Sequence, residues 1–198
     1  KFSLIVVPDT LSALQALAKE YRSLFSPVVI AITGSTGKTS TKDMTASILS
    51  QMGPTLKSQG NFNNEIGLPL TLLQLDESHK TAVVEMGMRG LGQIKLLTEL
   101  ARPRVGVITN VGTVHMELLG SQKAIQKAKQ ELIDTMEPGS AAVLNADDAL
   151  VKEMAQAAAD KEIIYYGWQK VPKDTSGRDN WVTAEHVISR GEEGVTFD

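Results

Sequence analysis

Residues 28–39 read VVIAITGSTGKT, and this stretch decides the fold. The apolar and mostly β-branched run Val28–Ile32 is typical of a strand that is covered on both faces. A glycine-rich turn, Gly34–Gly37, follows it, and a helical pattern begins at Lys38. This order brings backbone N–H groups and the positive end of a helix around one point, which suits a phosphate. The stretch therefore predicts a phosphate-binding loop in an α/β fold.

The side chains of this loop suggest that the ligand is a nucleotide. Lys38 can reach the β- and γ-phosphates, and the Thr39 hydroxyl can ligate Mg²⁺. We expect the phosphates to be held by Gly34, Ser35, Thr36, Gly37, Lys38, Thr39 and Ser40. The common consensus has a glycine five residues before Gly37, where this chain has Ile32, so the loop is a shortened form. The alternative interpretation is an ordinary strand–helix turn that contains Gly-Lys-Thr.

Beyond the loop, apolar runs alternate with helical patterns along nearly the whole chain. We expect strands at Leu4–Val7, Val28–Ile32, Ala82–Met86, Val105–Thr109, Ala141–Leu144 and Ile163–Tyr166. We expect helices from about Leu11 to Leu24, with Asp9 or Thr10 as N-cap, and over Lys38–Met52, Gly67–Leu75, Gln93–Ala101, Gln122–Met136 and Asp147–Ala159. Strands separated by helices pair in parallel through right-handed crossovers. The sequence therefore predicts a doubly wound, mostly parallel α/β sheet with helices on both faces, similar to P-loop NTPases. Ligands should gather beyond the C-terminal ends of the strands.

The chain divides into three expected parts. Residues 1–26 are expected to lead in from an upstream domain, because the chain begins without methionine and already in an apolar run. Residues 27–168 would form the nucleotide-binding domain. Residues 169–198 would form a small β appendage of that domain, with a turn-rich stretch at Lys170–Asn180 and strand-like runs at Trp181–Ile188 and Gly194–Phe197.

Composition excludes several classes of protein. The 198 residues are 42% hydrophobic and 22% charged, near the globular average, which excludes a disordered or fibrous chain. The absence of cysteine excludes disulfides, a thiolate metal site and a cysteine nucleophile. A net charge of −3 argues against nucleic-acid binding, since there is no basic excess to neutralise phosphates. No apolar run approaches the roughly 18 residues of a membrane span, and no signal peptide opens the sequence.

Polar residues follow two of the predicted strands. Glu85 ends one of them, and a carboxylate at the tip of a parallel strand faces the ligand crevice, where it can hold the Mg²⁺ of a nucleotide. Asn110 and His115 follow another strand. The imidazole can serve as a neutral ligand of a second metal ion, and Asn110 can support that site or the phosphate. The alternatives are a solvated acid and a structural or exposed histidine.

A third strand is followed by Asn145-Ala146-Asp147-Asp148. Asp147 or Asp148 would serve as the N-cap of the next helix. Asn145 lies at the strand tip in the same crevice, where it can bond an adenine edge.

Residues 60–69 read GNFNNEIGLP and concentrate amide side chains between two glycines. Loops rich in Asn and Gly are common as plain turns. Three asparagines in four positions, Asn61, Asn63 and Asn64, instead favour the lining of a polar substrate site.

Lys129 stands apart from its neighbouring lysines. At 100° per residue it lies in the middle of the apolar stripe of its helix, one turn after Ile125, whereas Lys123 and Lys127 lie on the opposite face. Geometry alone leaves two interpretations: a stem that packs while its amine reaches solvent, or a lysine aimed into the site.

Five motifs occur in an order that resembles the central ATP-binding domain of the Mur ligases, the amide-forming enzymes of peptidoglycan synthesis. They are TGSTGKT at 33–39, GNFNNEIGLPLTLL at 60–73, VVEMG at 83–87, ITNVGTVH at 108–115 and NADD at 145–148. The element NNEIGLP at 63–69 and the segment AKQELI at 128–133 look most like the family member that adds D-alanyl-D-alanine to UDP-N-acetylmuramoyl-tripeptide.

The resemblance implies a chemistry and a set of roles. ATP phosphorylates a substrate carboxylate, and the amine then attacks the acyl phosphate. By resemblance, Lys38 binds phosphate, and Thr39 and Glu85 bind Mg²⁺. His115 is a ligand of a second Mg²⁺, and Asn145 contacts adenine. The matching Lys129 is often carbamylated in relatives and helps to place that second ion.

The resemblance also implies partners and a larger protein. We expect small-molecule substrates and a monomeric bacterial enzyme in the cytoplasm. Family members have three domains, of which this chain resembles only the middle one, so alone it would bind nucleotide weakly and not complete the ligation. The alternatives are another Mur-type ligase, a folylpolyglutamate synthase, or a non-catalytic nucleotide-binding module that regulates a partner.

Overall fold

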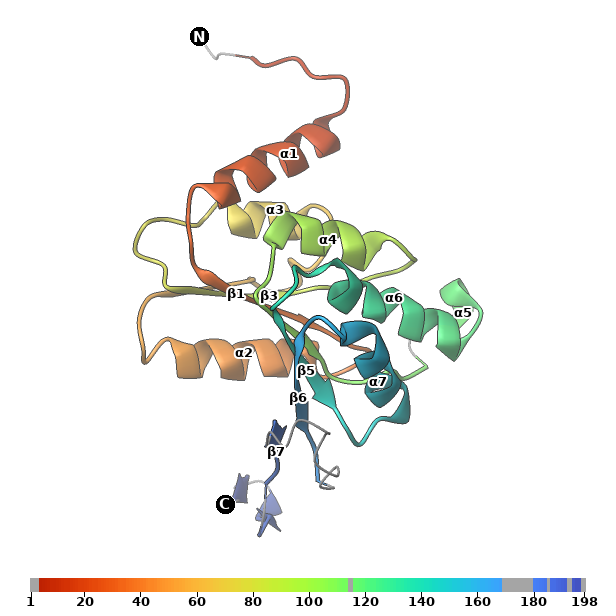
Figure 1. The fold of residues 1–198 in the computed structure, drawn as a ribbon. Coiled ribbons are helices and arrows are strands. Elements are labelled where there is room, and N and C mark those ends of the chain that lie inside the picture. Colours follow the sequence, from red (N-terminus) through yellow and green to blue (C-terminus); the bar gives the residue numbers. More distant parts are fainter. Residues whose placement is uncertain (1–3, 114–115, 169–179, 185, 192–193, 197–198) are drawn as a thin grey trace.

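The computed structural model describes residues 4–113, 116–168, 180–184, 186–191 and 194–196 (Figure 1). Seven strands form one sheet in the order β2-β3-β1-β4-β5-β6-β7, and every pairing in it is parallel. The strands are β1 Val28–Thr33, β2 Thr55–Lys57, β3 Thr81–Glu85, β4 Val105–Ile108, β5 Ala141–Asn145, β6 Glu162–Tyr166 and β7 Trp181–Val182. The predicted doubly wound α/β fold is confirmed.

Helices cover both faces of this sheet, as predicted (Figure 1). They are α1 Thr10–Ser23, α2 Lys38–Leu49, α3 Gly67–Leu72, α4 Gln93–Ala101, α5 Met116–Leu119, α6 Gln122–Thr135 and α7 Ala149–Glu153, which continues as the 3₁₀ helix η1 Met154–Ala158. Buried side chains of α3, α4, α6 and α7 share one large core. The residues of α2 pack into a smaller core on the other face.

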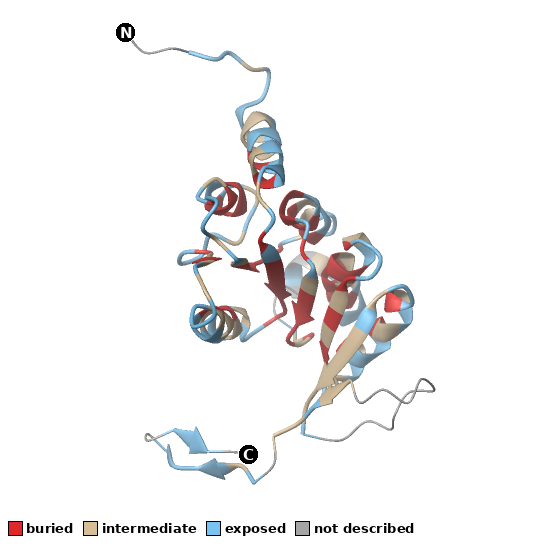
Figure 2. Cartoon of the chain, turned by 60° about the vertical axis from the view of Figure 1, so that its left-hand side comes forward, coloured by how far each residue is buried: buried red, intermediate tan, exposed pale blue. Residues whose placement is uncertain are grey.

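The central strand β1 shows why its sequence is apolar without interruption. Val29 and Ala31 belong to the large core, whereas Ile30 and Ile32 belong to the core under α2. Since successive side chains of a strand point to opposite faces, a strand between two helical layers needs apolar residues at every position (Figure 2). The phosphate loop therefore starts from a strand that is fixed on both sides.

The first predicted strand is wrong. Leu4–Val7 has no strand partner, and Leu4, Ile5 and Val6 are exposed. The run precedes α1, which packs on α3 and α4 in the helical layer and not beside the sheet. Tyr21 of α1 donates through its hydroxyl to the carbonyl of Leu75 at 2.9 Å. An apolar β-branched run without a neighbouring strand edge cannot form a ladder.

Other elements differ in extent from the predictions. The strand β2 and the short helix α5 are additional elements, and the helix expected over Lys38–Met52 ends at Leu49. Of the two expected N-caps of α1, Asp9 and Thr10, the structure shows Asp9. The helix expected over Asp147–Ala159 begins only at Ala149, because Asp148 is its N-cap.

The C-terminal part is divided between two sheets. Trp181–Val182 joins the main sheet as β7 beside β6, which corrects the expectation that it belongs to the appendage. The strands β8, Ile188–Ser189, and β9, Val195–Thr196, form a separate antiparallel pair. Most of the turn-rich stretch Lys170–Asn180 lies outside the described residues. No helix in the described part of the chain is long and apolar enough to cross a membrane.

Candidate functional site

The phosphate loop joins β1 to α2 through two glycines in unusual conformations. Gly34 has φ +152° and Gly37 has φ +78°. A Cβ atom at Gly34 would lie 1.8 Å from Oγ1 of Thr109, so only glycine fits between the loop and the end of β4. The loop is thus a close-fitting turn, as the order of strand, glycines and helix predicted.

Residues after β4 brace this loop from the side. Asn110 accepts the backbone N–H of Thr36 at 3.0 Å and donates to the Thr36 hydroxyl at 3.0 Å. Thr109 donates to the carbonyl of Thr36 at 2.7 Å, and the N–H of Gly112 donates to the hydroxyl of Ser35 at 2.9 Å. The amide of Asn110 is therefore engaged with the loop itself, and its expected support of a metal site or of the phosphate stays a prediction.

Lys38 curls back over the loop. Its Nζ donates to the carbonyl of Gly34 at 2.9 Å and to that of Ser35 at 3.2 Å. Both contacts are to neutral backbone carbonyls of the loop. Phosphate oxygens, which are charged acceptors, make stronger hydrogen bonds than carbonyls.

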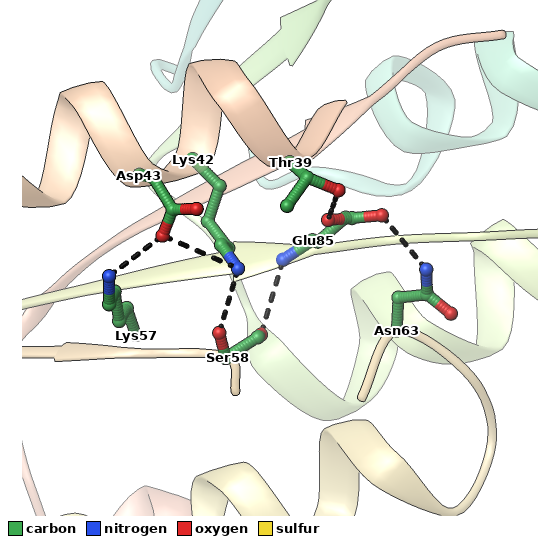
Figure 3. A network of polar contacts seen from close by, with 7 residues as sticks. All are labelled: Thr39, Lys42, Asp43, Lys57, Ser58, Asn63 and Glu85. Atoms are coloured by element: carbon green, nitrogen blue, oxygen red, sulfur yellow. Dashed lines mark hydrogen bonds and ion pairs between the residues drawn. The ribbon is translucent and has the colours of Figure 1, made fainter. Parts of the chain in front are cut away.

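A buried carboxylate lies beside the start of α2. Glu85, at the end of β3, is 3% exposed. Its Oε2 accepts the hydroxyl of Thr39 at 2.8 Å, and its Oε1 accepts the side-chain amide of Asn63 at 2.8 Å (Figure 3). A carboxylate next to a hydroxyl, both at the phosphate loop, is a pair of hard oxygen ligands that suits Mg²⁺. The described residues hold no group of three or more His, Cys, Asp or Glu that could bind a metal by itself.

Lys129 projects from α6 into a cavity of about 240 Å³, here named the Lys38–Lys129 cavity. It is lined by Gly34, Lys38, Asn61, Asn63, Asn64, Glu65, Gly87, Met88, Arg89, Gln93 and Lys129. Three of these side chains are basic and one is acidic, a balance that favours an anionic ligand. The cavity collects Lys38, Lys129 and all three asparagines of the predicted substrate loop.

The amine of Lys129 is in an unusual environment. The residue is 2% exposed, and burial, with a smaller contribution from the charge of Lys38, lowers its pKa from 10.5 to about 8. On the same helix, Lys127 is exposed and Lys123 pairs with Glu153 at 2.6 Å. Of the two interpretations from the sequence, the structure shows the lysine aimed into the cavity.

The asparagine loop also builds its own turn. The Oδ1 of Asn64 accepts the N–H groups of Ile66 and Gly67, at 3.1 and 2.8 Å, and so orders the entry to α3. Asn61 and Asn63 line the cavity, and the side-chain amide of Asn63 donates to Glu85. The loop therefore combines the structural role with the lining of a site.

A second cavity, here named the Asn145 cavity, lies beyond the C-terminal ends of β5, β6 and β7. It measures about 470 Å³ and is lined by Asn145, Asp147, Tyr166, Gly167, Trp168, Val182, Thr183 and Ala184. The amide of Asn145 donates to the carbonyl of Thr109 at 2.9 Å and accepts the N–H of Asp147 at 3.0 Å. Burial, with the nearby Asp148 and Asp147, raises the pKa of Tyr166 to about 12. Asn145 thus lines a cavity, while its amide is used within the protein.

His115 lies outside the described residues, so the expected second metal ligand has no structural account. Two residues of the site were not predicted. Lys42 and Ser58 are buried next to Glu85 and contact each other, as described below. Lys42 lies one turn before the buried Ala46 on α2, but the apolar Met44 and Ile48 of the same helix are exposed, so the sequence shows no clear apolar stripe around Lys42. Ser58 has no local signal either.

The sequence matches the Mur ligase middle domain family over residues 32–197. It is 51% identical over 162 residues to the UDP-N-acetylmuramoyl-tripeptide–D-alanyl-D-alanine ligase of Synechocystis sp., covering 82% of this chain and 36% of that protein. The ligase of the same name from Bacillus subtilis is 46% identical over 195 residues, covering 98% and 40%. The chain thus spans well under half the length of these relatives.

Solved structures agree with this match. MurF from Acinetobacter baumannii superposes with a TM-score of 0.83 and 34% identity, over 98% of this chain and 43% of that one. MurF ligase from Thermotoga maritima in complex with ADP superposes with a TM-score of 0.76 and 32% identity, over 84% of this chain and 40% of that one. A Mycobacterium tuberculosis folylpolyglutamate synthase, at 0.64 and 20% identity, shares the fold. The chain belongs to the Mur ligase family, of which it carries the middle domain.

Proposed function

We propose that this chain is the ATP-binding part of a bacterial ligase that adds D-alanyl-D-alanine to UDP-N-acetylmuramoyl-tripeptide. The observation that carries the proposal is the Lys38–Lys129 cavity, where a phosphate loop, two lysines and an asparagine loop meet. Relatives that are 46% and 51% identical bear the name of this ligase. Such an enzyme would act in the cytoplasm as a monomer, and residues 1–26 would lead into this domain from an upstream one.

The nucleotide is held chiefly by the loop. Residues 34–40 offer backbone N–H groups and the N-terminus of α2 to the phosphates, and Lys38 exchanges its two carbonyl partners for phosphate oxygens. Thr39 and Glu85 would hold Mg²⁺, which supplies positive charge to the phosphates when bound. Asn145 would approach the adenine from the second cavity, and His115 would bind a second Mg²⁺.

The acceptor carboxylate would enter the Lys38–Lys129 cavity past Asn61, Asn63 and Asn64. The carboxylate oxygen attacks the γ-phosphorus of ATP, ADP leaves, and an acyl phosphate forms. The amine of D-alanyl-D-alanine then attacks the acyl carbon, and phosphate leaves as the amide forms. The chain's own residues position the reactants and balance their negative charge, which is the main catalytic requirement of such a transfer.

Lys129 has a specific part in this proposal. Its lowered pKa of about 8 leaves roughly a tenth of the amine neutral at pH 7, and a neutral amine can add to CO₂ to give a carbamate with loss of a proton. The carbamate is an anion with two oxygens, so it would turn a basic residue into a ligand for the second Mg²⁺.

The test uses the full-length protein that contains this chain. Phosphate release should require ATP, UDP-N-acetylmuramoyl-tripeptide and D-alanyl-D-alanine together. Lys38→Ala should remove most ATP affinity in calorimetry, and Lys129→Ala should lose activity and partly recover it with acetate, which can occupy the vacated space. Lys127→Ala, on the exposed face of α6, is the matched control and should stay active. ATP binding without any substrate-dependent phosphate release would instead identify a non-catalytic nucleotide-binding module.

A further inference from the structure

A second buried lysine, Lys42, lies on α2 one turn after Lys38. Lys42 is 2% exposed, and its Nζ donates to the carbonyl of Ser58 at 2.9 Å (Figure 3). Asp43 lies 3.6 Å from the same ammonium through its Oδ1. A buried ammonium needs partners because burial removes its hydration, and the contact to Ser58 ties α2 to the end of β2.

Ser58 uses each of its polar groups in a different direction. It is 0% exposed and follows β2 directly. Its N–H donates to the carbonyl of Val83 at 3.1 Å, its carbonyl accepts Lys42, and its hydroxyl accepts the N–H of Glu85 at 3.3 Å. The hydroxyl thus takes over the contact between β2 and β3 at the point where the ladder has ended.

Both the carboxylate and the backbone N–H of Glu85 therefore contact residues that belong to α2 or are bound by it. Thr39 donates to its carboxylate, and Ser58, fixed by Lys42, accepts its backbone N–H. If Thr39 and Glu85 both turn toward Mg²⁺, the contact between their side chains is given up. The contact to Ser58 is made by the backbone N–H of Glu85 and not by its carboxylate, so it would persist and keep the carboxylate in place.

We propose that Lys42 is a positioning residue for the metal-binding carboxylate of Glu85 and acts through Ser58. The inference rests on the proposed function, because it takes Glu85 as a ligand of Mg²⁺. Loss of the Lys42 ammonium leaves the buried carbonyl of Ser58 without its donor and loosens the residue that orders Glu85. The ion is then bound less tightly, while the phosphate loop itself keeps all its contacts.

The chain offers a matched control for this test. Lys57 contacts the same Oδ1 of Asp43, at 2.7 Å, but is partly exposed and makes no contact with Ser58 in the described hydrogen bonds. Lys57→Met and Lys42→Met therefore both remove a positive charge beside Asp43. Only Lys42→Met removes a contact to Ser58.

The measurement is ADP binding by calorimetry to the full-length protein, without metal and at a series of Mg²⁺ concentrations. Lys42→Met and Ser58→Ala should raise the Mg²⁺ concentration for half-maximal enhancement at least fivefold and change metal-free ADP affinity less than twofold. Lys57→Met and Ser58→Thr, which keeps the hydroxyl, should resemble the wild type in both quantities. If Lys42→Met does not fold, Ser58→Ala against Ser58→Thr decides the question.

Two results would overturn the inference. One is a Mg²⁺ dependence of Lys42→Met and Ser58→Ala equal to that of Lys57→Met. The other is a loss of ADP affinity in Lys42→Met and Ser58→Ala that is as large without metal as with Mg²⁺. That result would place the effect in the phosphate loop and not at Glu85. Failure of the wild-type protein to bind ADP or to release phosphate would instead contradict the proposed function.

Discussion

Lys129 shows how one buried charge links the packing of a helix to the chemistry of a cavity. Its neighbours on the apolar stripe of α6, among them Ile125 and Leu132, are fully buried. The stripe therefore carries the amine into the Lys38–Lys129 cavity, whatever the cost of removing it from water. That cost has a measurable signature in the absence of any ligand.

We expect the stability contribution of Lys129 to change with pH in a defined direction. The pKa of Lys129 is about 8 in the folded protein, against 10.5 for an unburied lysine such as that of the unfolded chain. Below pH 8 both states hold the proton and the folded state bears the full cost of the buried charge. As pH rises from 8 to 10.5 the folded state has released the proton and the unfolded state has not, so this contribution to the unfolding free energy rises. The span is on the order of 3 kcal/mol, at about 1.4 kcal/mol for each pKa unit.

Urea denaturation of the full-length protein in bicarbonate-free, metal-free buffer checks this expectation. Lys129→Met should be more stable than the wild type at pH 7, and its advantage should shrink as pH approaches 10.5. Lys127→Met, the exposed control, should show a constant difference from the wild type over that range. A constant difference for Lys129→Met as well would contradict the lowered pKa.

At the scale of single residues, a local pattern in the sequence predicted the positions of two side chains, while their functional roles stay predictions. Lys129 was singled out by its place in a stripe, and Glu85 by its place at the end of a strand. Ser58 was not found, because its importance comes from three contacts to segments that are distant in the sequence. No composition or spacing around residue 58 encodes those neighbours.

At the scale of the elements, Asp148 connects the start of α7 to the end of β4. Its Oδ1 accepts the N–H groups of Leu150 and Val151, at 2.9 and 3.1 Å. Its Oδ2 accepts the N–H of Val111 at 2.7 Å. One carboxylate thus serves as the N-cap and also satisfies a backbone group of the segment that braces the phosphate loop.

Asp148→Ala should therefore cost more than the loss of an ordinary cap. An N-cap contributes about 1 kcal/mol, and a buried N–H left unpaired adds about 1–3 kcal/mol. Asp9→Ala, which removes the exposed N-cap of α1 with its single contact to Ser12, should cost only about 1 kcal/mol. Chemical denaturation of both variants compares them directly. Equal losses would show that the contact to Val111 adds nothing.

The errors among the predicted elements have a common physical origin. Leu4–Val7 and Val28–Ile32 are similar as sequences, but only the second has strands on either side to pair with. The strand β2 is three residues long at the sheet edge, with one buried side chain, Leu56, so it has no detectable period. Local pattern predicts which segments are able to form strands, and tertiary pairing decides which of them do.

At the scale of the whole molecule, the two cavities lie at the same edge of the sheet. The Lys38–Lys129 cavity includes residues that follow β1 and β3, whereas the Asn145 cavity includes the ends of β5, β6 and β7. Between them stands β4, whose following residues Thr109 and Asn110 brace the phosphate loop. The chain leaves β1 toward β2 on one side of the sheet and leaves β4 toward β5 on the other side. Ligands bind at such a switch point in folds of this kind. This part of the arrangement followed from the predicted topology.

A nucleotide whose phosphates lie on the loop can therefore extend past β4, so that its base enters the Asn145 cavity. Trp168 lines that cavity, is 67% exposed, and has its backbone N–H fixed by Asp147 at 2.8 Å. An adenine ring entering there would approach an aromatic side chain, and stacking changes indole emission. ADP should thus alter the tryptophan fluorescence of the full-length protein. Trp168→Phe should abolish the fluorescence change caused by ADP, whereas Trp181→Phe, the control, should retain it. The ADP affinity of Trp168→Phe, measured by calorimetry, should fall less than about fivefold. A response that survives Trp168→Phe unchanged would place the base outside the Asn145 cavity, and the role of Asn145 toward adenine would fall with it.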